Sequence, residues 1–394
     1  MSFVTYIVGI DIAKFSHECL ILNHHGEVVV QSFSFDNNYL GFKMLGTILS
    51  RTAHSTQIKI GFEATGHYGN NLKNFLINSG YDFMEIHPVL INRFSKAISL
   101  RKTKTDKVDA SLICSYLTSV EFKPYSLKSY HNTSLKSLIR TRNSLVKERS
   151  LQLQRMTNIL DIIFPEFKPF FKHSLKSSTA LYILKHYTLP SKIKRMTQSS
   201  YAKMASKLRR TISYARFIKL KELANNTVGT EDELLAFQLH SFLNLYNHFD
   251  NLIKEIDVLI LNEYKKANSY IHTIPGIGEI SAATIATEIG DIRKFSNPDK
   301  LVAFFGLDPA LYQSGETEFT GRMVKRGSSL LRQTIMNCAT YCLLHNPPLY
   351  DFYRKKRDEG KHHRVALSHV AKKLIRIIFA LETKEIEFDF NQMK

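Results

Sequence analysis

The sequence predicts an α/β domain at the N-terminus followed by a mainly helical remainder, and three observations support this fold class. Apolar runs of strand length alternate with helical segments over residues 1–120. Apolar residues repeat in heptads along the middle of the chain. Farther on, a Pro-Gly-Ile-Gly turn at 275–278 separates two helical stretches. A chain of 394 residues is long enough for two or three domains, and we place them at 1–125, 126–268 and 269–394.

The elements of the first domain are predicted from apolar runs and turn residues. TYIVGIDIA suits a central strand, and ECLILN and EVVVQSFSF flank the turn HHGE as an antiparallel hairpin. QIKIGFEAT and YDFMEIHP are further strands, separated by a helix that ends at Gly80. The helix NRFSKAI follows, and then a helix that carries Asp106 and Asp109. Three antiparallel strands followed by alternating helix and strand is the order of a ribonuclease-H-like domain.

The middle of the chain is predicted to be helical with coiled-coil character. Seven apolar residues are spaced alternately three and four apart, and they are Leu239, Phe242, Tyr246, Phe249, Ile253, Ile256 and Ile260. This spacing is a heptad seam. Such a seam pairs with another helix of the same chain or with a second chain, and the sequence leaves both arrangements open.

The net charge of +19 is concentrated in one segment. Residues 121–220 hold 21 Lys/Arg and 4 Asp/Glu, a net of +17, whereas residues 221–394 hold 22 of each sign. A polyanion relieves self-repulsion on this scale, and aromatic residues are interleaved with the basic ones. We therefore interpret the segment as a nucleic-acid surface that binds phosphates. A solvated basic face is the plainer alternative, and no amphipathic anchor favours a membrane surface.

Cysteine usage and apolar runs exclude several classes of protein. The four cysteines, at positions 19, 114, 338 and 342, are few and scattered, which excludes a disulfide scaffold. We interpret Cys338 and Cys342 as core packing. No apolar run approaches the roughly 18 residues of a membrane span, and MSFVTYIVGI lacks a basic leader. We expect a cytoplasmic protein with no membrane partner.

Four acidic residues are candidates for a divalent-metal site. Asp11 lies inside an apolar strand and Glu63 ends another, where an unpaired carboxylate is costly. Asp106 and Asp109 stand three apart at the start of a helix, which places them on one face. Oxygen-only ligands suit Mg²⁺ or Mn²⁺, and a pair of such ions about 4 Å apart supports phosphodiester chemistry. Taken singly, each acid is better explained as structural, for instance as a favourable charge at a helix start.

A second group of candidates lies in FFGLDPALYQSGETEFTGRMVKRGSSLLRQ, residues 304–333. Gly306 and Pro309 punctuate a loop that leads to Ser314. A serine needs a base or a metal to become a nucleophile, and no histidine lies nearby in the sequence, so these residues alone favour a turn serine. Five basic residues are candidate phosphate contacts. Lys104 precedes Asp106 and Asp109, and the other four follow Ser314, namely Arg322, Lys325, Arg326 and Arg332.

The stretch IPGIGEISAATIATEIGD has the pattern of a helix-hairpin-helix, a motif that contacts the DNA backbone. Gly276 and Gly278 let the turn tighten and bring backbone N–H groups near a phosphate. An ordinary helical hairpin with a glycine turn is the alternative.

These motifs together resemble the DEDD insertion-sequence transposases, the group that includes the pilin-gene invertases and the bridge-RNA-guided recombinases. IVGIDIAKFSHECLIL, FEATGHYGNNL and RKTKTDKVDA resemble the family's RuvC-like domain. The PGIG stretch and the serine stretch resemble its C-terminal transposase domain. The resemblance covers nearly the whole chain.

The resemblance implies a role for each candidate. Asp11, Glu63, Asp106 and Asp109 match the family's metal-binding tetrad, and Ser314 matches the serine that attacks DNA and forms a transient covalent link. The acids and the serine are implied to meet from different protomers, so a homo-oligomer, dimer or tetramer, is expected. A guide RNA encoded by the element is also implied, and the basic segment suits it because base pairing then reads sequence.

The predicted function is a DNA transposase or recombinase of a prokaryotic insertion sequence, associated with the nucleoid. Its cofactor is Mg²⁺ or Mn²⁺, and its substrates are donor and target DNA. One alternative is a Holliday-junction-type nuclease that uses the metals and no covalent serine. The other is a nucleic-acid-binding protein whose acids are structural. The serine motif disfavours the first, and Asp11 in an apolar strand disfavours the second.

Overall fold

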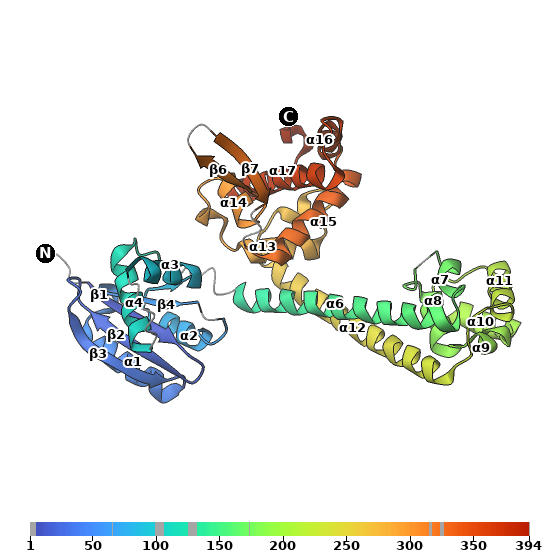
Figure 1. Cartoon of the computed structure of the whole chain (residues 1–394), viewed down its shortest axis with the longest axis horizontal. Coiled ribbons are helices and arrows are strands. Elements are labelled where there is room, and N and C mark those ends of the chain that lie inside the picture. The colour runs from blue at the N-terminus through green and yellow to red at the C-terminus, as the bar shows by residue number, and fades with distance from the viewer. Residues whose placement is uncertain are drawn as a thin grey trace. The chain divides into compact units, whose positions relative to one another are not determined.

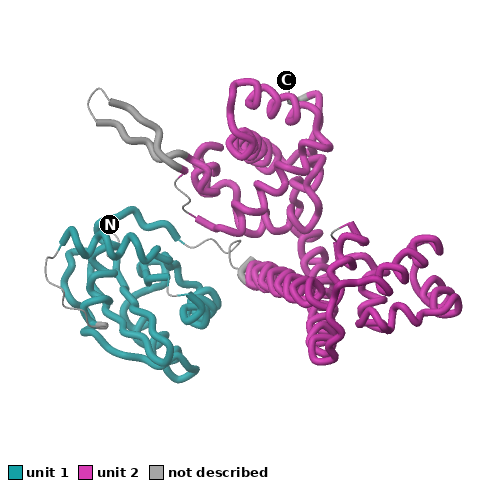
Figure 2. The backbone as a smooth tube through the Cα atoms, turned by 45° about the vertical axis from the view of Figure 1, so that its right-hand side comes forward, with its two compact units in different colours: residues 1–131 teal, residues 132–394 magenta. Residues whose placement is uncertain are grey.

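The computed structural model describes residues 5–64, 66–98, 106–124, 132–172, 174–314, 317–323 and 327–393. The model describes only the backbone, and not the side chains, of Asp106 and of residues 132–133, 309–314, 317–322 and 392–393. The chain forms two compact units, residues 1–131 and 132–394 (Figure 2). The three-part division with boundaries at 125 and 268 stays a prediction.

The first unit is built on a five-stranded mixed sheet (Figure 1). Its strands are β1 (Tyr6–Ile12), β2 (Ser16–Leu22), β3 (Val28–Asp36), β4 (Ile58–Glu63) and β5 (Phe83–Ile86). They lie in the order β3-β2-β1-β4-β5. The pairs β1–β2 and β2–β3 are antiparallel, whereas β1–β4 and β4–β5 are parallel. Each strand falls on an apolar run predicted from the sequence, so the predicted α/β start of the chain is confirmed.

Helices cover both faces of this sheet because its central strands are apolar on both sides. α1 (Tyr39–Thr52) and α2 (Asn70–Asn78) pack on one face through four leucines. α3 (Pro88–Ile98) and α4 (Asp106–Ser119) pack on the other face. The sequence did not predict α1, although Asn38 caps it by accepting a hydrogen bond from the Gly41 N–H.

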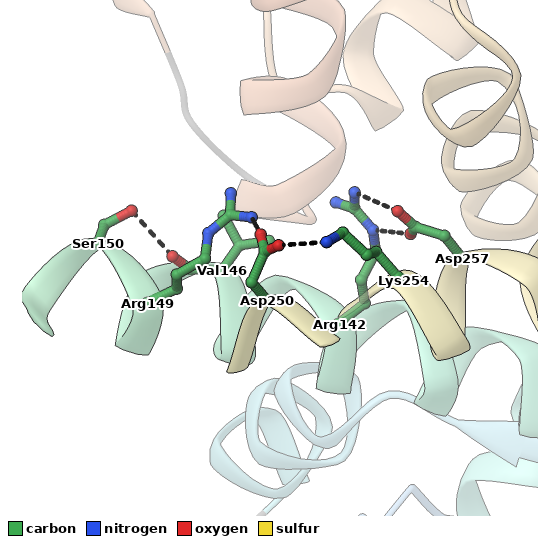
Figure 3. Close-up of polar contacts among 7 residues, drawn as sticks. All are labelled: Arg142, Val146, Arg149, Ser150, Asp250, Lys254 and Asp257. Carbon is green, nitrogen blue, oxygen red and sulfur yellow. Dashed lines mark hydrogen bonds and ion pairs between the residues drawn. The ribbon is translucent and has the colours of Figure 1, made fainter. Parts of the chain in front are cut away.

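Two long helices, α6 (Asn132–Ile163) and α12 (Glu233–Lys265), lie side by side and antiparallel in the second unit. Arg142 forms an ion pair with Asp257, and Arg149 with Asp250, so the pairs repeat one heptad apart on each helix (Figure 3). Four predicted seam residues are buried, namely Leu239, Tyr246, Ile253 and Ile260. The seam therefore pairs within the chain, and the alternative pairing between chains loses the support of this pattern.

Five shorter helices connect the end of α6 to the start of α12. They are α7 (Phe167–Phe170), α8 (Ser178–His186), α9 (Pro190–Lys194), α10 (Gln198–Lys207) and α11 (Tyr214–Asn225). We call residues 164–232 the distal lobe. Its core, which includes Phe164, Phe167 and Phe217, also takes in the adjoining ends of α6 and α12.

The rest of the second unit is mostly helical and surrounds one large core. Its helices are η2 (Ile271–Thr273), α13 (Glu279–Ile289), η3 (Ile292–Lys294), α14 (Pro298–Phe304), α15 (Ser329–His345), α16 (Pro347–Asp358), α17 (His363–Lys384) and η4 (Phe390–Met393). Cys338 and Cys342 are buried here, as predicted, and burial raises their pKa values to about 11 and about 12. Among the described residues, no helix combines the length and apolarity needed to cross a membrane.

The serine stretch forms a two-stranded antiparallel hairpin, where the sequence suggested a loop. Its strands are β6 (Pro309–Ser314) and β7 (Thr317–Met323), and Ser314 pairs with Thr317 at the turn end. Aromatic and β-branched residues such as Tyr312 and Phe319 favour strands, and this local preference outweighed the glycine and proline punctuation.

Candidate functional site

The predicted acidic site begins where β1 and β4 end. These strands are parallel neighbours, and the pairing of Ile10 with Phe62 places Asp11 beside Glu63 at the following position. Ile10 and Phe62 belong to the core under α1 and α2. Side chains alternate between the two faces of a strand, so Asp11 and Glu63 both face the side covered by α4. Both side chains are half-buried.

Helix α4 lies directly on β1 at a glycine. A Cβ at Gly9 would lie 2.4 Å from the carbonyl oxygen of Ala110, so only glycine permits this approach. One turn later in α4, Cys114 Sγ lies 4.0 Å from the carbonyl oxygen of Ile7. Ala110 and Cys114, one turn apart on α4, both stand against Gly9. Helix α4 therefore crosses β1 at this residue, two positions before Asp11.

The first turn of α4 carries the other two predicted acids. Asp106 is the first residue of the helix, and its side chain lies outside the described part of the structure. Asp109 is half-buried. Among the described side chains, no three acids, histidines or cysteines stand together as a ready metal site. Carboxylates repel one another until a cation neutralises them, so a closed arrangement is expected only with the ion bound. The oxygen donors fit Mg²⁺ or Mn²⁺ in kind.

Ser314 ends β6 beside the turn of the hairpin and belongs to the second unit. At the base of the hairpin, Gly327 has a φ of 87°, and a Cβ there would lie 2.4 Å from the carbonyl oxygen of Phe304. Arg332 of α15 donates from Nη1 to the carbonyl oxygen of Phe305 at 3.5 Å. This hydrogen bond links α15 to the segment that leads into the hairpin. The predicted contact of Arg332 with nucleic acid stays a prediction. Several predicted groups lie outside the described residues, namely the side chains of Ser314 and Arg322 and all of Lys104, Lys325 and Arg326.

The two glycines of the PGIG loop have different surroundings. Gly276 has a φ of 99°, and a Cβ there would lie 2.6 Å from the Cα of Cys342 on α15. Gly278 is the N-cap of α13 and has open space around its Cα. Packing alone thus accounts for Gly276, and the phosphate contacts of both glycines stay predictions.

Positive charge gathers where two helices of the distal lobe meet the adjoining end of α12. Lys185 and His186 end α8, Lys203 and Lys207 lie one turn apart on α10, and His240 comes from α12. Burial lowers the pKa of His186, and the neighbouring charges of the other four residues lower it further. We call these five residues the basic cluster. Its three lysines are exposed, as a phosphate-binding surface requires. The sequence revealed the density of basic residues in the segment 121–220. It did not reveal that residues of α8, α10 and α12 come together, since His240 lies outside that segment.

Two family models match the chain. A model of DEDD transposases of the IS110 type, described as "Transposase", matches residues 8–165, which include the four predicted acids. A model described as "Transposase IS116/IS110/IS902 family" matches residues 268–354, which include the PGIG loop and the serine hairpin. Both models agree with the resemblance predicted from the motifs.

Curated relatives match along most of the chain. The pilin gene-inverting protein of Moraxella bovis is 23% identical over 98% of this chain and 98% of that protein. The IS116 uncharacterized 44.8 kDa protein of Streptomyces clavuligerus is 23% identical over 95% and 94%. The transposase for IS1328 of Yersinia enterocolitica is 23% identical over 84% and 82%. With transposase models matching both ends of the sequence, the chain belongs to the DEDD transposases of the IS110 insertion-sequence family.

Proposed function

We propose that this protein recombines DNA by cutting and rejoining strands through a covalent link to Ser314, assisted by divalent cations at the acidic face of the first unit. The transposase family supports DNA as the substrate, and a relative is named for inverting a pilin gene. The observation that carries the metal site is Asp11 beside Glu63 on the face covered by α4. A ribonuclease-H-like character of the first unit is part of the proposal, and the strand order β3-β2-β1-β4-β5 supports it.

In the proposed site, Asp11, Glu63, Asp106 and Asp109 hold Mg²⁺ or Mn²⁺. When bound, such ions polarise a scissile phosphate and help a hydroxyl lose its proton. The chain supplies hard oxygen donors from two adjacent strands and one helix, which are rigid supports for a site. Gly9 contributes by allowing the backbone of α4 to lie directly on β1.

The proposed reaction exchanges one phosphate ester for another. The Ser314 oxygen attacks a backbone phosphorus, its proton departs, and a phosphate–serine ester forms as one ester bond within the DNA strand breaks. The released DNA hydroxyl takes up a proton. A second DNA hydroxyl then attacks the same phosphorus, which frees the serine and rejoins the strand. Ester bonds are conserved throughout, so the exchange needs no external energy source.

Nucleic-acid partners are proposed for the basic part of the second unit. The basic cluster offers exposed lysines to phosphates, and an element-encoded guide RNA paired with donor and target DNA would leave the protein to read backbone and shape. The acids and Ser314 belong to different units of the chain, which is compatible with a site shared between protomers of a dimer or tetramer.

The covalent link is tested with the full-length protein and labelled DNA that carries the element junctions. With Mg²⁺ and the element's noncoding RNA, the wild type is expected to form a denaturant-resistant protein–DNA adduct. Ser314→Ala is expected to abolish it because the attacking oxygen is removed, and Asp11→Asn is expected to reduce it strongly. The adduct is measured by denaturing gel electrophoresis.

Ser329→Ala is the matched control, since Ser329 is an exposed serine in the same stretch, at the first position of α15. It is expected to form the adduct at the wild-type level. An adduct that survives Ser314→Ala would remove the serine from the proposal. Metal-dependent cleavage by Ser314→Ala that leaves hydrolysed 5′-phosphate ends would favour the junction-nuclease alternative.

A further inference from the structure

A cavity of about 200 Å³ lies within the second unit and is lined by three helices. Helix α6 lines it from Ile139 to Val146, α13 from Ile280 to Thr284 and α15 from Leu330 to Asn337. On each helix the lining residues recur three or four positions apart, so each helix contributes one face. The walls of the cavity are therefore helical, and helices hold a binding site more precisely than loops do.

Three side-chain amides of the lining have no partner in the protein. Within the described ranges, the amides of Asn143, Gln333 and Asn337 form no hydrogen bond with another residue. The hydroxyls of Thr284 and Thr334, by contrast, donate to carbonyl oxygens one turn earlier in their helices, at 2.8 and 2.9 Å. Each amide places an N–H donor beside a carbonyl acceptor. The groups left for a ligand are thus neutral donor–acceptor pairs.

The lining offers no free charge. Among the described residues that line the cavity, Arg142 alone is charged, and it already forms an ion pair with Asp257 (Figure 3). Apolar side chains, among them Ile139, Val146 and Leu330, make up much of the remaining wall. A phosphate or a metal ion needs charged partners, so this cavity suits a neutral ligand with both apolar surface and a polar edge.

A nucleobase has these properties, and its size agrees with the cavity. Pockets for drug-sized ligands have volumes of about 300–1,000 Å³, so about 200 Å³ suits a smaller group such as one base. The donor–acceptor pair of an asparagine or glutamine amide matches the N6 and N7 atoms of adenine. Guanine is matched by a free arginine or lysine instead, and Arg142 is already paired.

We propose that this cavity receives one unstacked adenine base of a nucleic-acid strand, with the amides of Asn143, Gln333 and Asn337 bonding to its edge. The inference rests on the proposed function, because the strand belongs to the nucleic acid on which the protein acts. It also extends that function. A guide RNA leaves the protein to read backbone and shape, whereas this cavity reads one base directly.

The surroundings of the cavity favour a strand of nucleic acid as the source of the base. Lys147 follows Asn143 by about one turn of α6, and within the described ranges this exposed lysine forms no ion pair. It suits a phosphate of the strand that carries the base. Two of the three helices, α13 and α15, also lie within residues 268–354, which match the transposase family model.

The test uses the full-length protein and labelled single strands of about 12 nucleotides, the scale of a single-strand site. The probes are oligo(dA), oligo(dT), oligo(rA) and oligo(rU), and fluorescence anisotropy gives their affinities. The readout is the ratio of the affinity for an adenine strand to that for the matching pyrimidine strand. Stacking within each free strand is the same for every protein variant, so it cancels when these ratios are compared.

Asn143→Leu, Gln333→Met and Asn337→Leu keep the approximate size of each side chain and remove its donor and acceptor. The triple variant is expected to lower the ratio about tenfold, which lies within the discrimination that one bidentate amide–base contact supplies. Each single variant is expected to lower it by a smaller factor, so the singles carry the test if the triple variant does not fold. Affinity for the pyrimidine strands is expected to hold, because the phosphate contacts remain.

Gln154→Met is the matched control, since Gln154 is an exposed amide of α6 outside the cavity. It is expected to keep the wild-type ratio. A fall of the ratio in the cavity variants with the DNA strands assigns a DNA base to the cavity, and a fall confined to the RNA strands assigns an RNA base. An unchanged ratio in all the cavity variants would overturn the inference. An equal loss of affinity for every strand would overturn it too, since the amides would not then distinguish bases.

The adduct assay separates this inference from the proposed function. A wild-type adduct on junction DNA, together with an unchanged ratio in the cavity variants, would overturn the base cavity and leave recombination through Ser314 standing. A ratio that falls as expected, with no wild-type adduct, would support the base cavity and contradict the covalent chemistry. A wild type that forms no adduct and binds none of the strands would overturn both.

Discussion

Gly276 and Gly278 stand two residues apart in the PGIG loop, yet the structure constrains them differently. Gly276 combines a φ of 99° with the backbone of α15 at its Cα, so a side chain there meets both strain and a clash. Gly278 has a φ of −74°, which any residue adopts, and nothing lies near its absent Cβ. The sequence motif treats the two glycines alike, because a motif records residue type and not surroundings.

At the residue scale, Gly276→Ala is expected to lower the free energy of unfolding by about 1–3 kcal/mol through overpacking, with the unfavourable φ adding to the loss. Gly278→Ala is expected to change the free energy of unfolding by less than about 1 kcal/mol, since alanine fits this φ and reduces the entropy of the unfolded chain, whereas glycine is the better of the two residues at the N-cap of α13. Urea denaturation followed by circular dichroism measures both. Equal stability of the two variants would contradict the close packing at Gly276.

At the scale of elements, one buried carboxylate joins α13 to α6. The Glu288 side chain is 2% exposed, and it accepts contacts from Lys136 at 3.3 Å and from Arg140 at 3.2 Å. The two cations are partly exposed and reach the acid from α6. A buried carboxylate that keeps such partners orients two helices relative to each other, while the apolar contacts around it supply most of the stability.

Glu288→Gln is therefore expected to destabilise the protein by about 1–3 kcal/mol, because two charge-assisted contacts to a buried oxygen pair are weakened. Chemical denaturation measures the change. Glu263→Gln is the matched control, since Glu263 pairs with Lys266 at 2.6 Å while more than half of each side chain is exposed. An exposed pair of this kind contributes under about 1 kcal/mol. A loss as large in Glu263→Gln as in Glu288→Gln would show that burial does not decide the effect.

At the scale of the whole molecule, charge separates along the chain. Residues 121–220 carry a net of +17, and residues 221–394 carry none. Part of the basic segment is neutralised internally, as Arg142 and Arg149 are by α12. In the part of the chain that the structure describes, no acid forms an ion pair with a lysine of the basic cluster, and the charges that act on His186 are those of lysines and another histidine. The exposed lysines of the cluster are thus the cations of the lobe best placed to exchange solvent ions for phosphates.

Replacing Lys185, Lys203 and Lys207 together by glutamine is expected to weaken nucleic-acid binding. The slope of log affinity against log salt is expected to become shallower by roughly 2–3, because each lost phosphate contact contributes about 0.7–0.9. Fluorescence anisotropy over a salt series, with a structured RNA and with duplex DNA, measures the slope and shows which nucleic acid the cluster contacts. An unchanged slope with both would contradict the assignment.

The control for this variant is the triple replacement of Lys254, Lys265 and Lys266 by glutamine. It removes the same charge, but two of these lysines already pair with Asp250 and Glu263. It is expected to leave the slope close to that of the wild type. An equal loss in both triple variants would mean that net charge alone governs binding.

The amino-acid sequence by itself determined the strands of the first unit, the heptad seam and the family. These follow from periodicity and motifs, which depend on residues a few positions apart. Helix α1 was not predicted because its local pattern is weak. The serine hairpin was not predicted because its strand-favouring residues lie among glycine and proline.

Only the tertiary structure decided which residues oppose one another. The seam on α12 pairs with α6 of the same chain, and the backbone of α4 packs against Gly9. Glu18 pairs with Asp11 across two strands, and His240 lies near lysines of the distal lobe. Register and crossing points depend on the packing of segments distant in sequence. A shift of one residue in β2 would turn Glu18 to the other face of the sheet.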